Sequence, residues 1–245
     1  MTESEIRKAL ISHLSALPQG RGATFISELF IDGFARRADL VMANGKLAAF
    51  EIKSARDTLN RLSGQIQSYV RFFEQVTIVC AQRHVESVAS SVPEQIGVWC
   101  VSDSGDLNVV RRAATKSSLR KDNWLSFLPV PELRALLRER GCKTVGDRPE
   151  LVERAEKISL RAIRQYVLAY LKRRHKRIEG FISKRAAVRA PIAQGNRGPT
   201  YEQLVELLSA ASTIGAAIPR ARPRRARHST SDSPSASLRC SEKSI

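Results

Sequence analysis

Two apolar segments around Asn44-Gly45 constrain the fold of this chain most strongly. Residues 37–43 and 47–54 are rich in strand-forming side chains, and an Asn-Gly pair between two such segments is a strong signal for a β-hairpin. Successive side chains of a strand point to opposite faces, so the register of the hairpin decides which residues lie together. The length of the loop must therefore be inferred before any site can be considered.

A loop of three residues, 44–46, explains the pattern better than a loop of two. The two-residue loop would place Asp39 opposite Phe50, whereas the longer loop places Asp39 opposite Glu51. One face of the longer hairpin then carries the apolar side chains of Leu40, Met42, Phe50 and Ile52. The other face carries the charged residues with two smaller apolar ones: Asp39, Glu51, Lys53, Val41 and Ala49. We adopt this register because it separates polar from apolar residues, and three-residue loops that contain glycine are common.

Two opposed carboxylates repel each other, and a divalent cation bound between them offsets this repulsion. Mg²⁺ binds one or two protein carboxylates and keeps water and substrate phosphate as its other ligands. Such a metal lowers the pKa of a bound water, and Lys53 on the same face could hold that water or neutralise developing charge. The alternative is an ordinary exposed face with a salt bridge between Glu51 and Lys53.

The remaining pattern up to about residue 115 predicts a mixed α/β unit. Helical spacing of apolar residues predicts helices at 4–17, with Ser4 as the cap, at 57–74 and at 84–91. Residues 76–81 read as a buried strand, and residues 97–102 and 106–110 as a second hairpin. Residues 23–31 fit either a strand or a short helix, and the pattern does not decide between them.

Further polar residues surround the acidic pair and carry a resemblance. Glu28 lies upstream in an apolar context, and Gln65 and Tyr69 share a helix face at i, i+4 spacing. With Asp39 followed by Glu51-Ile52-Lys53, residues 1–110 resemble the PD-(D/E)XK nuclease superfamily. Gln65 to Tyr69 resemble the Q-x-x-x-Y element of its RecB-like branch. The proline usual before the first motif acid is replaced by Ala38.

The resemblance implies a restriction-endonuclease-like mixed sheet flanked by helices, which cleaves DNA phosphodiester bonds with Mg²⁺ or Mn²⁺. The implied catalytic residues include the signature triad and its supporting side chains: Asp39, Glu51, Lys53, Glu28, Gln65 and Tyr69. The implied metal ligands are three carboxylates and one backbone carbonyl: Asp39, Glu51, Glu28 and that of Ile52. Members of this superfamily act as recombination resolvases or as restriction and repair nucleases, and some have lost activity.

The charge of the chain is concentrated in its second half. Lys and Arg number 41 and Asp and Glu 24, of which 13 basic and 12 acidic residues lie in positions 1–115. The rest of the chain therefore holds 28 basic and 12 acidic residues. An excess of this size favours a polyanionic partner, which we expect to be DNA, because the basic segments lack the large apolar anchors of a membrane-surface helix.

Residues 130–157 resemble a SAP module, a small helix–loop–helix DNA binder. The resemblance rests on three sets of residues: Leu133, Leu136 and Leu137; Gly141, Thr144 and Gly146; and Glu150, Leu151, Val152 and Arg154. Asp147-Arg148 replaces the lysine often found after the loop glycine. An ordinary helical hairpin that packs on the sheet is the alternative.

A basic helix, predicted at 159–178, follows this hairpin. Its charge surrounds one and a half turns and suits contact with phosphates without sequence reading. The predicted DNA-binding residues are Arg134, Arg138, Lys143, Arg148, Lys172, Arg173, Arg174, Lys176 and Arg177. The predicted domains are thus 1–115, nuclease-like; 124–180, SAP-like; 181–216, a linker with a short helix at 201–212; and 217–245, a disordered basic tail.

Other features bound the setting of the chain. The cysteines Cys80, Cys100, Cys142 and Cys240 form no C-x-x-C pair, and the first two read as buried structural thiols. We find no signal peptide, no membrane-spanning segment and no NTPase-type phosphate loop, so we expect a cytoplasmic bacterial or phage-encoded protein that does not use ATP. A homodimer is possible. The competing hypotheses are a nuclease, a catalytically silent DNA-binding or repair accessory protein that keeps the fold, and an unrelated α/β binding protein.

Overall fold

The computed structural model describes residues 1–116 and 119–193, with side chains to residue 183. The chain divides into a first unit, Met1–Ala187, and a second one that begins at Val188. The helices of the first unit are α1 (Glu3–Ala16), α2 (Leu62–Phe72), α3 (Val85–Ser91), α4 (Lys121–Ser126), α5 (Val130–Glu139), α6 (Arg148–Glu156) and α7 (Leu160–Ala193), the last of which continues into the second unit. Two 3₁₀ turns, Pro18–Gly20 and Gln82–His84, complete the helical elements of the described residues.

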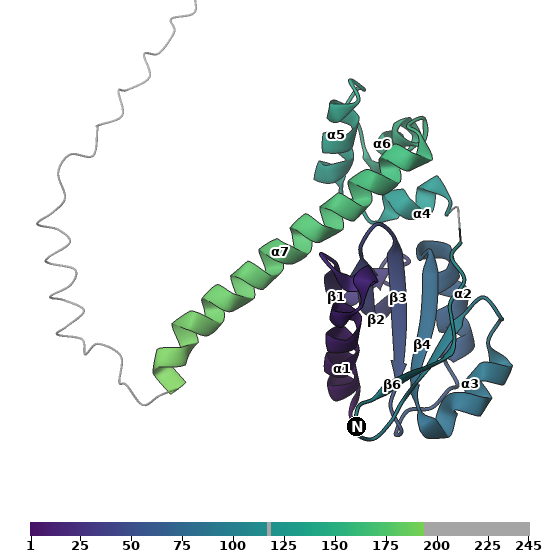
Figure 1. Ribbon diagram of the computed structural model, residues 1–245. Coiled ribbons are helices and arrows are strands. Elements are labelled where there is room, and N and C mark those ends of the chain that lie inside the picture. The colour runs from purple at the N-terminus through teal and green to yellow at the C-terminus, as the bar shows by residue number, and fades with distance from the viewer. Residues whose placement is uncertain (117–118, 194–245) are drawn as a thin grey trace, which may run out of the picture. The chain divides into compact units, whose positions relative to one another are not determined.

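A six-stranded mixed sheet forms the centre of the first unit (Figure 1). Its strands lie in chain order: β1 (Thr24–Ile31), β2 (Arg36–Ala43), β3 (Leu47–Lys53), β4 (Gln75–Ala81), β5 (Gly97–Val101) and β6 (Leu107–Arg111). The pairs β1–β2, β2–β3 and β5–β6 are antiparallel, while β3–β4 and β4–β5 are parallel. The predicted α/β class with a mixed sheet is therefore confirmed, and residues 24–31 are a strand.

Helix α1 covers one face of the sheet. Its Ile6, Leu10 and Leu14 are fully buried against the large apolar face predicted for the β2–β3 hairpin. The helix begins one residue before the predicted cap: Thr2, and not Ser4, is the N-cap. Thr2 and Glu5 exchange hydrogen bonds as a capping box, which satisfies backbone donors of the first turn.

Helix α2 packs on the opposite face, against Val41, Ala43 and Ala49. The periodicity predicted that this helix begins at residue 57, but it begins at Leu62. Asp57 accepts hydrogen bonds from the backbone and hydroxyl of Ser54, and this local turn takes the place of a first helical turn.

Helices α4 to α7 share the core that α2 builds. Buried side chains of α5 and α6, among them Leu133, Leu137 and Leu151, belong to the same apolar cluster as β4 and α2. The predicted nuclease-like part and the predicted SAP-like segment are therefore packed into one unit. Arg164 of α7 fastens this region to the sheet, because its guanidinium donates to the buried carboxylate of Glu74 and to the carbonyl of Gly45 in the β2–β3 loop.

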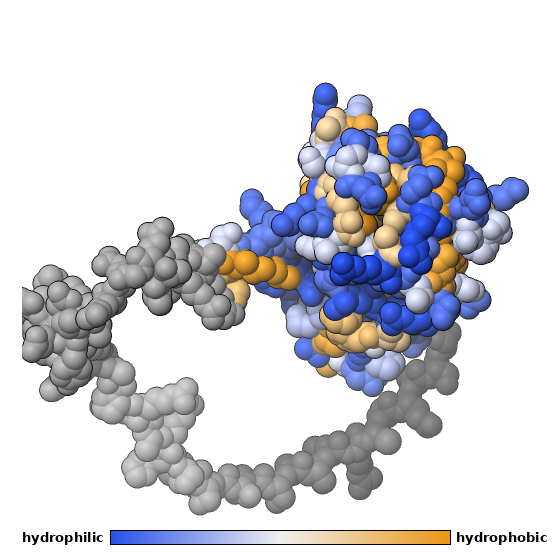
Figure 2. Space-filling model, turned by 90° about the horizontal axis from the view of Figure 1, so that it is seen from below, coloured by the Kyte–Doolittle hydropathy of each residue, from blue (hydrophilic) through white to orange (hydrophobic). Residues whose placement is uncertain are grey.

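The end of α7 differs from its prediction. Residues 181–193, expected as linker, continue the helix, because Gly180 alone does not end a helix that good helix formers follow. On its outer turns Ile178, Phe181 and Ile182 are exposed, and Figure 2 shows apolar side chains along this part of the helix. The predicted helix at 201–212, the tail from 217 and Cys240 lie outside the described residues.

One smaller prediction, that of buried structural cysteines, is confirmed. Cys80 and Cys100 are buried and free, and burial raises the pKa of the Cys80 thiol to about 12. Tyr166 and Tyr170 are buried packing residues of α7. Among the described residues, no helix is both long and apolar enough to cross a membrane.

Candidate active site

The β2–β3 hairpin has the predicted register. Ala43 pairs with Leu47 across a three-residue loop, in which Gly45 takes a positive φ of 68° that favours glycine. Leu40 pairs with Phe50, and there the β2–β3 ladder ends. Strand β2 remains paired with β1 as far as Arg36, so the two neighbours of β2 separate at this point.

Asp39 lies where β2 leaves β3. Its Oδ2 accepts a hydrogen bond from the backbone N–H of Ile52 at 2.8 Å. A carboxylate thus takes the place of the next ladder partner, which holds Asp39 beside Glu51 as the register predicted. The backbone carbonyl of Ile52 was predicted as a metal ligand, and the structure places this residue next to the acid.

Glu51 collects the other predicted side chains. Only 1% of its surface is exposed, and Lys53 Nζ donates to its Oε1 at 2.8 Å. Gln65 Nε2 donates to the same oxygen, while the Tyr69 hydroxyl donates to Oε2 at 2.6 Å. The helix face that Gln65 and Tyr69 share therefore meets the hairpin at this carboxylate. Burial and the charge of Glu51 raise the pKa of Tyr69, so its hydroxyl stays a donor.

The carboxyl group of Asp39 titrates far from its ordinary range. Burial, and then repulsion by Glu51, raise its pKa from 3.8 to about 7, although the hydrogen bond from Ile52 acts in the opposite direction. A group with a pKa near neutrality changes its charge readily in response to a bound cation.

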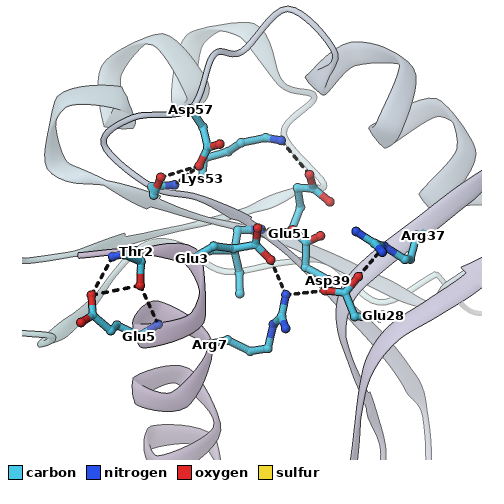
Figure 3. A network of polar contacts seen from close by, with 12 residues as sticks. Thr2, Glu3, Glu5, Arg7, Glu28, Arg37, Asp39, Glu51, Lys53 and Asp57 are labelled. Atoms are coloured by element: carbon cyan, nitrogen blue, oxygen red, sulfur yellow. Dashed lines mark hydrogen bonds and ion pairs between the residues drawn. The ribbon is translucent and has the colours of Figure 1, made fainter.

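Three carboxylates from different elements form a candidate metal site. Single oxygens of Glu3 on α1, Glu28 on β1 and Asp39 on β2 all lie within 4.8 Å of one another. Figure 3 shows these residues where the start of α1 meets the sheet. Carboxylate oxygens are the donors that Mg²⁺ and Mn²⁺ prefer, so this donor set fits the metal that the resemblance implies.

The composition of this cluster differs in part from the prediction. Asp39 and Glu28 belong to it, whereas Glu51 is occupied by Lys53, Gln65 and Tyr69. Glu3 was missed, because an acid in the first turn of a helix is already explained by the helix dipole.

Two arginines balance the charge of the cluster. Arg7 Nη2 contacts Glu3 and lies 2.5 Å from Glu28 Oε1, while Arg37 pairs with Glu28 from β2 (Figure 3). A guanidinium thus lies between two of the three candidate ligands, and a metal would compete with it.

The predicted DNA-binding residues differ in exposure and in what their side chains contact. Arg148 points inward and donates to the carbonyls of Leu128 and Leu125, which close α4, so this prediction is not supported by the geometry. Three others make contacts within the protein: Arg134 with Gly146, Lys172 with Gly22, and Arg173 with Glu132 and the ring of Tyr166. Six of the nine side chains lie on exposed surface: Arg134, Arg138, Lys143, Arg173, Lys176 and Arg177. Arg174 is half-buried on α7.

Two comparisons with known proteins agree on one relationship. The family model described as Bacteriophage P4 protein cII matches residues 1–194, which include every residue of the site. Protein cII of Enterobacteria phage P4 is 36% identical over 190 residues, covering 75% of this chain and 72% of that protein. A protein of unknown function from Silicibacter pomeroyi superposes with a TM-score of 0.40 at 19% identity, over 57% of this chain and 92% of that one.

Proposed function

The chain belongs to the bacteriophage P4 protein cII family, and we propose that it hydrolyses DNA phosphodiester bonds as a metal-dependent nuclease of the PD-(D/E)XK type. The observation that carries this proposal is the convergence of Lys53, Gln65 and Tyr69 on Glu51, directly beside Asp39. The resemblance implied that these five residues lie together, and a chance charged pattern would not bring the helix residues to the same carboxylate. A mixed sheet with helices on both faces is also what the resemblance implies.

Glu3, Glu28 and Asp39 would hold the cation, as Mg²⁺ or Mn²⁺. When bound, it would make water a stronger nucleophile and stabilise charge on the phosphate. Lys53, whose ammonium donates to Glu51 and Gln65, would neutralise charge that develops on the phosphate oxygens. Gln65 and Tyr69 keep Glu51 in one orientation, so the position of Lys53 is maintained.

The basic second half would hold the DNA. The exposed Arg138, Lys143, Lys176 and Arg177 suit phosphate contacts that do not depend on sequence. Such binding weakens steeply as salt is raised, because each phosphate contact releases counterions.

A nicking assay on supercoiled plasmid tests the proposal. The full chain is incubated at low salt with Mg²⁺ or Mn²⁺, beside Asp39→Ala, Lys53→Ala and, as a matched control, Asp103→Ala in the exposed β5–β6 turn. We expect cutting that EDTA abolishes, that the first two variants lose, and that the control retains. Cutting that persists in Asp39→Ala would contradict the assignment of this site.

A second candidate is a DNA-binding accessory protein without catalysis. It is favoured by one observation: both oxygens of Glu51 are occupied by protein donors, and Arg7 lies among the candidate metal ligands. Salt-sensitive DNA binding without cutting of duplex, single-stranded or branched DNA by the intact chain would support this candidate and overturn the first.

A further inference from the structure

An exposed aromatic pair lies at the end of the β1–β2 hairpin, next to the acidic cluster. Phe34 is 79% exposed and Phe30 49%, and their ring centroids are 5.5 Å apart. We propose that this pair stacks on an unpaired base of the nucleic-acid strand bound at the acidic cluster, which makes single-stranded and branched DNA the preferred substrate class. The inference rests on the proposed function and deepens it.

The hairpin connects the aromatic pair directly to the site. Phe30 is the ladder partner of Arg37, and the guanidinium of Arg37 pairs with Glu28 of the acidic cluster. Glu28 and Asp39 each lie two residues from the Phe30–Arg37 pair, which is about 7 Å along a strand. A base stacked on the pair would therefore belong to a nucleotide within one or two steps of the phosphate at the site.

The backbone at the tip holds Phe34 in a costly conformation. Its φ is 71°, a left-handed value that is unusual for a bulky side chain and that glycine would adopt without strain. Asp32 and Gly33 also have positive φ, so the tip presents its aromatic ring by a tight left-handed turn. An exposed ring contributes little to folding. An exposed ring held in a strained conformation favours a role in contact with another molecule.

The surrounding charge favours nucleic acid as that molecule. Arg37 on β2 and Arg71 on α2 both expose more than half of their side chains, and Arg71 pairs loosely with Asp32 of the tip at 3.7 Å. Aromatic rings beside arginines form the usual platform for single strands, where bases stack and phosphates pair with guanidinium groups. A second copy of the chain is a weaker candidate, because two phenylalanines supply far less than the roughly 800 Å² per partner of a stable interface.

Binding without metal tests the proposal separately from cleavage. Oligonucleotides that carry 2-aminopurine are offered in EDTA as a single strand, a flap and a continuous duplex to the full chain, Phe34→Ala and Phe34→Gly. Val110→Ala, which shortens an exposed apolar side chain on β6, is the control. We expect 2-aminopurine quenching in the single strand and flap. Both Phe34 variants should bind these roughly 5- to 100-fold more weakly, with duplex affinity changed less than twofold.

Thermal unfolding tests whether weaker binding comes from a destabilised fold. Phe34→Gly should be at least as stable as the parent chain, because glycine adopts the positive φ of this position without strain. Equal single-strand affinity of parent and Phe34 variants would overturn the proposal, as would self-association that requires Phe34 in the absence of DNA. If Phe34-dependent quenching is observed but Mg²⁺ or Mn²⁺ produces no cutting, the nuclease function fails and the stacking surface stands. If cutting is observed but the Phe34 variants bind single strands as tightly as the parent chain, the stacking proposal is overturned and the nuclease proposal stands.

Discussion

The Tyr69 hydroxyl donates to Oε2 of Glu51 at 2.6 Å, across the interface between α2 and β3. The Glu51 carboxylate is almost fully buried and has no access to water, so it depends on protein donors for its hydrogen bonds. The contact therefore joins the stability of the α2 interface to the orientation of a candidate active-site acid.

Tyr69→Phe should destabilise the fold by about 1.5–3 kcal/mol, because a buried charged acceptor loses a donor while the ring is kept. Urea unfolding at neutral pH measures the change, with Tyr170→Phe on α7 as the control. A change in Tyr69→Phe no larger than in the control would mean that the hydroxyl does not hold Glu51.

Asp39→Asn should stabilise the metal-free protein at alkaline pH. The folded-state pKa of about 7 lies above the ordinary 3.8, so folding favours the protonated acid, and the chain loses stability as pH rises from about 4 through 7. Asparagine keeps an acceptor for the Ile52 N–H without this loss. The variant should gain on the order of 1–3 kcal/mol at pH 8 and nothing at pH 4, after allowance for partial exposure. Unfolding curves in EDTA between pH 4 and pH 8 measure how the stability gain of Asp39→Asn changes with pH. A gain confined to acid pH would contradict the raised pKa of Asp39.

Arg7→Met should make the fold depend on metal. Its removal leaves Glu3 and Glu28 without the cation that lies between them, so the melting temperature in EDTA should fall. Added Mg²⁺ or Mn²⁺ should then raise it by more than in the parent chain, because a ligand that binds only the folded state stabilises it. The exposed Arg83→Met is the control. An equal metal response in all three proteins would show that the acidic cluster does not bind these cations.

Arg164→Met should destabilise the attachment of α7 to the sheet by about 2–4 kcal/mol, since Glu74 is 6% exposed and would keep an unpaired charge. The double variant with Glu74→Gln should recover part of this loss. Arg120→Met, in a pair with exposed Asp122, should cause no measurable change in urea unfolding. Single and double variants of equal stability would argue against a buried charge at Glu74.

Gly97→Ala should destabilise the sheet by roughly 1–3 kcal/mol. A Cβ at this position would lie 2.9 Å from the backbone nitrogen of Ala113 and 2.8 Å from Thr77 Oγ1. The backbone contact cannot be relieved by a change of rotamer. Thermal unfolding beside Gly180→Ala, where a Cβ meets nothing within 4 Å, measures the difference. Equal melting temperatures of the two variants would mean that the first residues of β5 can move to accommodate the methyl group without loss of stability.

The register of the hairpin could be predicted because only one loop length separates its apolar residues from its charged ones. The start of α2 could not, because Leu59 continues the helical period into a turn that Ser54 and Asp57 close locally. The signature of the Thr2–Glu5 capping box was present in the sequence, and it could have replaced Ser4 as the predicted cap.

The site was predictable to the extent that it depends on one hairpin and one helix face. Glu3 and Arg7 reach it from α1, and no local pattern reports which end of a helix meets which strand. Arg148 shows the converse: a basic residue in a basic segment points inward to carbonyls at the end of α4, and composition cannot distinguish this from an exposed side chain.

The three-residue loop between β2 and β3 limits how the length of this chain can vary. Removing or adding one residue in 44–46 would turn every side chain of one strand to the other face, and Asp39 would exchange places with an apolar neighbour. The turn at 102–106 carries no such restriction, since β6 is an edge strand with largely exposed side chains. Insertions and deletions among descendants of this sequence should therefore accumulate in the second hairpin and be excluded from the first.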